Sequence, residues 1–347
     1  MKALIYYGPK DIRLEEIPKP VPGEKDVIVK VMRAGICGSD VKAWLIGGET
    51  VGIFPKGTFG LDGQIGHEMV GVVDEVGSAV EGIAAGDRVF VNPTVCKRAG
   101  MMTCDMSGAF SEYVHVEDAA YGYNLLKLSD DTTFDEAVMT EPLSVATHGK
   151  NVVKVKPHEH VMIYGAGTIG LCALEAVLSV GCRRPVVVDI NPDRLRVAEE
   201  LGGTAFNPKD GVAISDYLKG HFGTVRSPLG EETVDVDAYI DCAGAPHIVN
   251  EITAMAKYNA RIAIVAVYKG NVTFDMVKFS NRQLKLKGSL GYENSDVLEA
   301  YNNIDQHRNQ VSKLVTHAFP IDRGVEAIRT AADPASGAIK VVINYEL

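Results

Sequence analysis

The sequence has no long hydrophobic run, few cysteines and a deficit of positive charge. No apolar stretch approaches the roughly 18 residues of a membrane span, and Met1-Lys2-Ala3 leads into a strand-like segment rather than a signal peptide. Six cysteines without regular spacing in 347 residues are typical of reduced thiols. A net charge of -10 argues against general affinity for nucleic acid or anionic membrane. These absences predict a cytoplasmic protein that binds neither membranes nor nucleic acid.

The composition is that of an ordinary globular protein, and the length suggests about two domains. In the first third of the chain, short apolar runs alternate with charged or glycine-rich turns. This pattern predicts antiparallel strands of a small barrel-like or sandwiched sheet. The expected strands are 3–7, 12–17, 27–31, 69–76, 88–91 and 110–116.

The pattern changes near Phe134, where helical spacing extends to Val153. Beyond it, near-continuous apolar runs alternate with helical segments, which predicts a doubly wound parallel sheet. The last strand-like segment, Lys340–Tyr345, is expected to return and pack on the first domain. The expected strands are 161–164, 185–189, 238–242 and 261–267, and the expected helices are 171–180, 193–201, 248–256, 297–307 and 325–332.

A glycine motif lies between the first apolar strand of this second region and the following helix. It reads Gly165-Ala166-Gly167-Thr168-Ile169-Gly170. The first glycine allows a tight turn, the second lets a pyrophosphate approach the backbone, and the third permits close packing of helix on strand. In this context the motif predicts a dinucleotide site of the Rossmann type, with phosphates at the helix N-terminus.

Asp189 closes the next predicted strand, at about the 20-residue distance expected of a ribose-binding acid. It could instead cap the following helix, but Asn191-Pro192 already supplies a cap and a proline at the first helical position. A carboxylate there accepts hydrogen bonds from a ribose diol and repels a 2′-phosphate, so NAD is favoured over NADP. Arg194 is the residue that leaves NADP open, because an arginine nearby can bind that phosphate.

Residues able to bind a metal gather on two strand-like segments. Cys37 follows an apolar run, and His67 and Glu68 open another. Each alone is more often structural: a buried cysteine is a small hydrophobe, and a histidine or glutamate a hydrogen-bonding group. Together they offer sulfur, nitrogen and oxygen, which zinc accepts, and three protein ligands leave one position open for chemistry. Glu141, in a third segment, is a further candidate.

These motifs resemble the zinc-dependent medium-chain dehydrogenase/reductase superfamily, with the closest resemblance to its sorbitol (polyol) dehydrogenase branch. The residues that carry the resemblance are Cys37-Gly38-Ser39-Asp40, Gly66-His67-Glu68 through Gly71, Gly77 and Val80, and Glu141-Pro142-Leu143-Ser144-Val145. It covers essentially the whole chain.

The resemblance implies a mainly β, GroES-like catalytic domain over 1–143 and 288–347, and an NAD-binding Rossmann domain over 144–287. It also implies a catalytic zinc held by Cys37, His67 and Glu68, and a homodimer or homotetramer. The strand at 260–267, followed by 268–274, is expected to continue the sheet across a two-fold axis, as in relatives that pair their cofactor domains. One thiolate and one carboxylate already neutralise the zinc charge, and a second direct carboxylate would make the metal a poorer Lewis acid. Glu141 is therefore expected beside the metal, through a bound water or as an alternate ligand.

The chain departs from the family in places. Many members bind a structural zinc with four closely spaced cysteines, but the corresponding region holds only Cys96 and Cys104, so no structural zinc is expected. The polyol branch often has a histidine where this chain has Lys42, and an arginine where it has Gly291. Sorbitol itself is therefore not the expected substrate, whereas a secondary alcohol of another polyol, sugar alcohol or related cyclic or phosphorylated sugar derivative is.

In the expected reaction, an alcohol takes the open metal position, Ser39 accepts its proton and passes it to the cofactor ribose or to solvent, and hydride passes to the nicotinamide. Ser39 could instead be a turn hydroxyl that bonds its own backbone. Trp44, Phe59 and Tyr292 are candidates for the substrate wall, although for the first two ordinary packing is an equal alternative. The competing functions are a zinc-free quinone or enone reductase of the same architecture and a non-catalytic nucleotide-binding protein.

Overall fold

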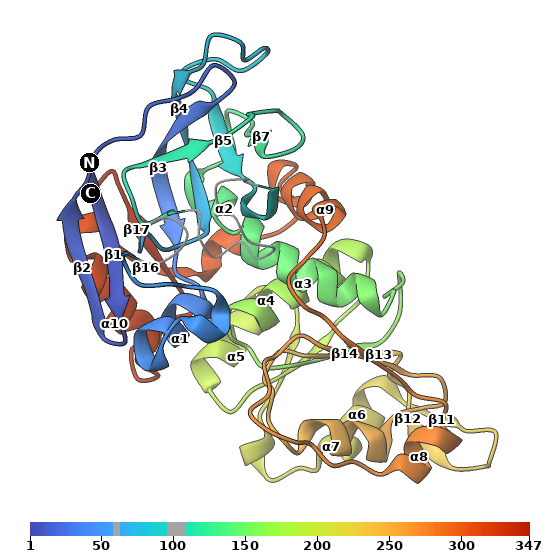
Figure 1. The fold of residues 1–347 in the computed structure, drawn as a ribbon. Coiled ribbons are helices and arrows are strands. Elements are labelled where there is room, and N and C mark those ends of the chain that lie inside the picture. The colour runs from blue at the N-terminus through green and yellow to red at the C-terminus, as the bar shows by residue number, and fades with distance from the viewer. Residues whose placement is uncertain (58–62, 96–107) are drawn as a thin grey trace. The chain divides into compact units, whose positions relative to one another are not determined.

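The computed structural model describes residues 1–57, 63–95 and 108–347 (Figure 1). The chain divides into two compact units, one of Met1–Pro142 with Val297–Leu347 and one of Leu143–Asp296. The chain therefore re-enters the first unit at Val297, rather than at residue 288 as the sequence suggested. Each unit has its own sheet.

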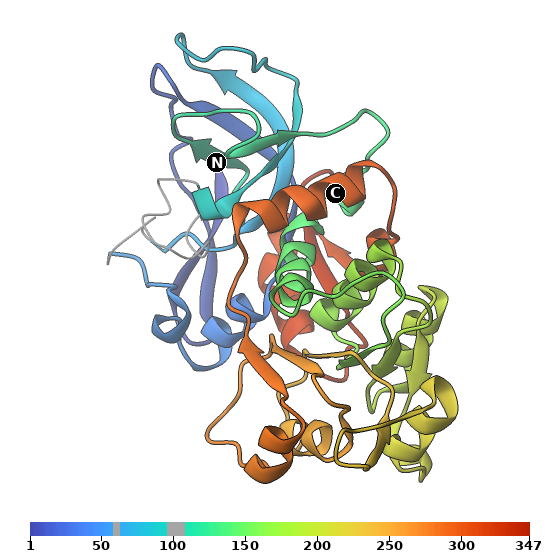
Figure 2. The same cartoon turned by 90° about the vertical axis from the view of Figure 1, so that its right-hand side faces the viewer.

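The first unit is built on a sheet that has seven strands in the described part of the chain, in the order β16-β17-β3-β4-β5-β7, with β6 also paired to β3. All its pairs are antiparallel except β16 with β17. The strands are β3 (Val27–Gly35), β4 (Glu68–Val76), β5 (Arg88–Val91), β6 (Tyr113–Val116), β7 (Leu125–Lys127), β16 (Val315–Phe319) and β17 (Lys340–Asn344). Figure 2 shows the long strands of this sheet from the side. Because β17 pairs with β3, the prediction that the tail packs on the first domain is confirmed.

Strand β3 is central, and its sequence explains why. Val27, Ile28, Val29 and Val31 are all buried, while Lys30 is exposed. A nearly continuous apolar run of β-branched residues suits a strand covered on both faces. This strand therefore fixes the position of the two neighbours, β4 and β17, that carry the site residues discussed below.

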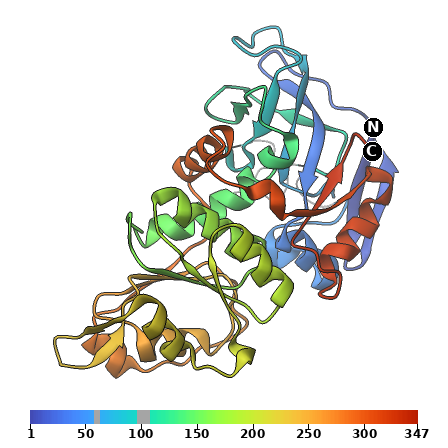
Figure 3. The same ribbon diagram turned by 180° about the vertical axis from the view of Figure 1, so that it is seen from behind.

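A hairpin and several helices complete the first unit. The hairpin pairs β1 (Lys2–Gly8) with β2 (Asp11–Glu16). Figure 3 shows α10 lying beside this hairpin. The helices are α1 (Gly38–Ile46), α2 (Phe134–Ala137) and α10 (Gly324–Ala332), with short 3-10 turns at Glu49–Val51, Pro93–Val95, Val311–Leu314 and Ile321–Arg323; α3 (Thr140–Val152) begins here and α9 (Asn294–Asp305) ends here.

The second unit is a six-stranded parallel sheet in the order β10-β9-β8-β13-β14-β15. Its strands are β8 (Val161–Tyr164), β9 (Val186–Val188), β10 (Thr204–Phe206), β13 (Ala238–Asp241), β14 (Arg261–Ile264) and β15 (Lys285–Gly288). A small antiparallel pair, β11 (Thr224–Arg226) and β12 (Glu232–Val234), stands apart. The sheet confirms the predicted doubly wound fold.

Helices cover both faces of this sheet, as Figures 1 and 3 show for α4 on one side and α7 on the other. The packing of β8 agrees with this arrangement. Its alternate residues Met162 and Tyr164 belong to the core cluster that includes Leu218 of α6 and Ile248 and Ile252 of α7. The helices of the second unit are α4 (Thr168–Val180), α5 (Pro192–Glu200), α6 (Ile214–Phe222), α7 (Ile248–Met255) and α8 (Met276–Asn281).

Some predicted elements were wrong. The helix expected over 134–153 is two helices, α2 and α3, and the hydroxyl of Thr140 donates to the carbonyl of Ala137 at the break. The segment 260–267, expected to continue the sheet into a second subunit, holds β14, which is flanked by β13 and β15. The exposed edge is instead β15, all of whose residues are exposed.

Among the residues that the structure describes, no helix combines the length and the apolar character required to cross a bilayer.

Candidate functional site

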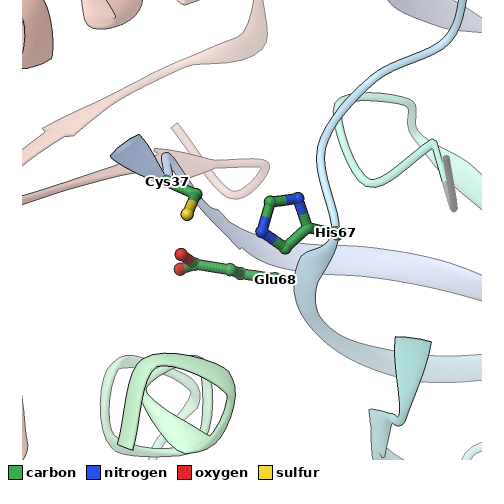
Figure 4. Close-up of side chains that lie close together, drawn as sticks. All are labelled: Cys37, His67 and Glu68. Atoms are coloured by element: carbon green, nitrogen blue, oxygen red, sulfur yellow. The ribbon is translucent and has the colours of Figure 1, made fainter. Parts of the chain in front are cut away.

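Three potential zinc ligands meet in the first unit. Cys37 precedes α1, His67 precedes β4, and Glu68 is the first residue of β4. One ligand atom from each lies within 4.8 Å of the others, and Figure 4 shows the three side chains pointing toward one another. His67 and Glu68 are both 1% exposed. The structure thus brings together the three residues that the sequence analysis grouped.

The backbone around His67 is set by glycines that no other residue can replace without collision. Gly66 has a φ of +89°, and a Cβ there would lie 2.7 Å from the Phe110 ring. A Cβ at Gly71 would lie 2.1 Å from the carbonyl oxygen of Lys30 on β3. Glycine relieves both constraints, because it tolerates positive φ and a close strand approach. Gly66 and Gly71 therefore allow the tightly packed backbone that positions His67 and Glu68.

The backbone at Cys37 is fixed by a buried carboxylate. Cys37 is the N-cap of α1, and its backbone N–H donates to Asp40 Oδ2 at 2.9 Å. Asp40 is fully buried. The positive end of the α1 dipole favours a negative charge at this place, as a thiolate ligand carries.

The donor set fits zinc. Zinc takes sulfur at about 2.3 Å and nitrogen or oxygen at about 2.0–2.2 Å, so ligand atoms within 4.8 Å of one another need only small adjustments to close on one ion. A half-buried thiol beside a buried imidazole and a buried carboxylate has no obvious purpose in packing alone, because burying polar groups is costly. Cys37, His67 and Glu68 would hold the ion.

Glu141 stands beside this set. It is the second residue of α3, is 3% exposed, and its Oε1 lies 3.9 Å from His67 Nε2. It is not among the three residues whose ligand atoms are all within 4.8 Å of one another. This placement suits a group near the metal more than a permanent ligand.

Ser39 lies in the first turn of α1, two residues after Cys37. Its Oγ is buried, and no described residue makes a hydrogen bond with it. The alternative, in which the hydroxyl bonds its own backbone in a turn, is therefore not what the structure has. A buried hydroxyl with unused hydrogen-bonding capacity suits an incoming polar ligand.

One residue of this region was missed by the sequence analysis. Lys340, the first residue of β17, is buried, and its ammonium forms an ion pair with Glu68 Oε2. Desolvation by burial lowers the pKa of Lys340, but attraction by Glu68 and Cys37 outweighs it, so the pKa is raised. The available signal was a lysine opening the apolar strand Lys340–Asn344, where a buried charge demands a partner.

The structure bears differently on the three residues expected to line the substrate site. Trp44 is 6% exposed and belongs to the hydrophobic core of the first unit, which favours the packing interpretation. Tyr292 is half-buried and lies in the second unit. Phe59 lies outside the described residues, as do Cys96 and Cys104.

The glycine motif forms the turn between β8 and α4. Gly165 has a φ of +92°, and a Cβ at Gly170 would lie 1.8 Å from the Gly165 carbonyl oxygen. Gly167 is the N-cap of α4, with Thr168 and Ile169 in the first helical turn and only Arg194 Nη1, at 3.9 Å, near its missing Cβ. The N-terminus of α4 is thus an open anion-binding end.

Asp189 follows β9 directly and is half-buried. Its Oδ2 accepts from Ala166 N at 2.7 Å, within the glycine turn, and its Oδ1 accepts from Asn191 N at 2.8 Å. Asn191 caps α5 through its own side chain, as the sequence indicated. Each carboxylate oxygen has a second lone pair, so Asp189 retains capacity for a ribose hydroxyl.

Comparison with known proteins defines the class to which the chain belongs. Residues 23–129 match the alcohol dehydrogenase GroES-like domain, and residues 168–306 match the zinc-binding dehydrogenase family. The sorbitol dehydrogenase of Rattus norvegicus is 31% identical over 348 residues, covering 95% of this chain and 92% of the relative. The chain therefore belongs to the zinc-dependent medium-chain dehydrogenase/reductase superfamily, in its sorbitol dehydrogenase-like branch, and is a zinc-dependent oxidoreductase of the polyol dehydrogenase type.

Solved structures agree with this fold. The 2R,3R-butanediol dehydrogenase from Bacillus subtilis is 25% identical, with a TM-score of 0.85 and 99% coverage of both chains. A zinc-binding dehydrogenase from Sinorhizobium meliloti 1021 bound to NADP is 25% identical, with a TM-score of 0.79, covering 99% of this chain and 98% of the other.

Proposed function

We propose that this chain oxidises one secondary hydroxyl of a polyol or vicinal diol, using one zinc ion per chain and NAD as the hydride acceptor. The observation that carries the proposal is the set of half-buried Cys37 with buried His67 and Glu68, whose ligand atoms lie within 4.8 Å of one another. When bound, zinc supplies a Lewis acid that acidifies the alcohol, and the nicotinamide supplies the hydride acceptor.

The chain's own residues have separate roles in this proposal. Cys37, His67 and Glu68 hold the metal, and the three-ligand set leaves a position open. Ser39 Oγ, which is buried and bonded to no described residue, accepts the hydroxyl proton and passes its own proton to the cofactor ribose or to solvent. Glu141, 3.9 Å from His67 Nε2, acts as a conditional ligand or through a bound water. Tyr292 remains a substrate-contact candidate, and Phe59 a candidate by sequence only.

NAD is the proposed cofactor because Asp189 lies at the end of β9 with its carboxylate bonded to the glycine turn. A fixed negative charge there repels the 2′-phosphate of NADP. Gly165, Gly167, Thr168, Ile169 and Gly170 would hold the pyrophosphate at the N-terminus of α4. The opposing feature is Arg194, whose Nη1 lies 3.9 Å from the position of a Cβ on Gly167, and a relative of similar fold binds NADP.

The substrate class rests on the relatives and on charge. Sorbitol dehydrogenases and a butanediol dehydrogenase, which the chain resembles, act on molecules with neighbouring hydroxyls. The departures at Lys42 and Gly291 disfavour sorbitol itself. A polyol, sugar alcohol or phosphorylated sugar derivative with a secondary hydroxyl is the proposed substrate.

Two measurements test the proposal. Elemental analysis of purified protein is expected to give about one zinc per chain, and no metal would favour a quinone reductase or a nucleotide-binding protein. The reduction of NAD and of NADP is then followed with a panel of diols, polyols and polyol phosphates. Reduction of NAD by none of them, with zinc bound, would contradict the proposed activity.

We also propose a cytoplasmic homo-oligomer. The cysteines that the structure describes, Cys37, Cys172, Cys182 and Cys242, are all free thiols, which suits a reducing compartment. The exposed edge strand β15 has backbone groups available to pair with a second copy. Light scattering would give the mass, and a monomer would contradict the oligomer.

A further inference from the structure

Lys340 places a positive charge in the interior of the first unit, against a proposed metal ligand. The side chains of Lys340 and Glu68 are 2% and 1% exposed. The Lys340 ammonium pairs with Glu68 Oε2 and donates a hydrogen bond to the carbonyl oxygen of Ile36 at 3.0 Å. Buried lysines are rare, and a charge buried at this position requires a partner of opposite charge.

The ion pair involves three neighbouring strands. Lys340 comes from β17 and Glu68 from β4, and Gly35 on the strand between them lies opposite Glu68 in the ladder. A Cβ on Gly35 would lie 2.0 Å from Glu68 Oε2 and 2.8 Å from Lys340 Cε. The space for the ammonium exists because residue 35 has no side chain.

Among the described residues, the proposed ligands and Glu141 together carry more negative charge than one zinc ion neutralises. A zinc ion carries two positive charges, whereas a thiolate at Cys37 and carboxylates at Glu68 and Glu141 carry three negative ones. The Lys340 ammonium pairs with Glu68 Oε2 and both side chains are almost completely buried, so its positive charge lies beside this excess of negative charge. In a poorly solvated interior an uncompensated charge is costly.

We propose that Lys340 sets the net charge of the metal site: it compensates the carboxylate in excess, so that the zinc remains a strong Lewis acid. The ammonium pairs with Oε2 of Glu68, and the other carboxylate oxygen would be available to hold the metal. Lys340 is a positioning residue rather than a catalytic one. The inference rests on the proposed zinc function, and it has an unusual consequence: a cation beside a dication weakens metal binding while it strengthens the metal as an electrophile.

The test compares zinc affinity in the wild type, Lys340→Met and Lys340→Arg, by competition with a chelator of known affinity. The expected result is that Lys340→Met binds zinc about tenfold more tightly or better, because the repelling charge is gone, while its turnover falls. Lys340→Arg keeps the charge and is expected to bind zinc within about threefold of the wild type. Lys30→Met, at an exposed position on β3, is the matched control and is expected to change nothing.

Melting temperatures of the metal-free and zinc-loaded proteins give a second readout. Zinc is expected to raise the melting temperature of Lys340→Met more than that of the wild type, because the ion replaces the missing counter-charge of Glu68. Unchanged or weaker zinc binding by folded Lys340→Met would overturn the inference, as would equal tightening in Lys340→Arg. So would a Lys340→Met chain that fails to fold even with excess zinc. A wild type that binds no zinc would instead refute the proposed function.

Discussion

Replacing Gly35 with alanine should damage the metal site more than the fold. The new Cβ would lie 2.0 Å from Glu68 Oε2, whereas ordinary contact begins at 3.4 Å. The carboxylate must therefore retreat by about 1.4 Å, and Lys340 Cε, 2.8 Å from the same point, must also move. Both side chains are almost completely buried, so neither can swing into solvent.

The magnitude follows from the ion pair that this movement disrupts. Removing one partner of a buried pair costs about 3–5 kcal/mol, and separating the partners without removing either should cost about 3 kcal/mol. We expect Gly35→Ala to lower the free energy of unfolding by that amount in urea denaturation. Zinc retained after dialysis should fall well below the wild-type content, because Glu68 is no longer in position.

Gly220→Ala is the matched control. Gly220 lies within α6, without a positive φ and with nothing within 4 Å of the position that a Cβ would take. Alanine there should stabilise the protein by about 0.5–1 kcal/mol, because glycine is a poor helix former. If Gly35→Ala unfolds at the same urea concentration as the wild type and keeps its zinc, the contact between Gly35, Glu68 and Lys340 is not as tight as described.

Three further predictions concern other residues. Ser39→Ala should lower kcat at least about tenfold while zinc per chain stays constant, and unchanged turnover would remove Ser39 from the reaction. Asp189→Ser should lower the ratio of kcat/KM for NAD to that for NADP about tenfold, since the charge that repels the 2′-phosphate is lost; an unaltered ratio would assign cofactor choice elsewhere. Burial raises the pKa of Asp305, but hydrogen bonds from Ser129 and Thr132 outweigh it and the pKa is lowered. The carboxylate therefore contributes stability above its unfolded pKa of about 4, which is lost as pH falls through the folded value, and Asp305→Asn should weaken this acid dependence of urea unfolding.

The second sheet and its nucleotide turn could be predicted from local sequence because their determinants are local. Buried parallel strands are continuous apolar runs, and Gly165 and Gly170 are required by a turn and a close contact that lie within a few residues. Short strands such as Thr204–Phe206 carry too few residues for a period, so their pairing with β9 is visible only in the fold.

The helix boundaries failed for a related reason. The run from Phe134 to Val153 has helical spacing throughout, yet the chain breaks between Ala137 and Thr140. The spacing of apolar residues shows which residues share a helix face. It does not reveal a side-chain hydroxyl that donates to a nearby backbone carbonyl, as that of Thr140 does.

The metal site divides in the same way between sequence and tertiary structure. The identities of Cys37, His67 and Glu68, and the glycines that aim the last two, are properties of short segments, and they sufficed to indicate zinc. The counter-ion is different: Lys340 is 272 positions from Glu68, and it meets that residue only because β17 and β4 both pair with β3. The sequence by itself determined which ligands are available. The net charge around them was decided by strand pairing, because a contact between residues far apart in the chain produces no periodic pattern in the sequence.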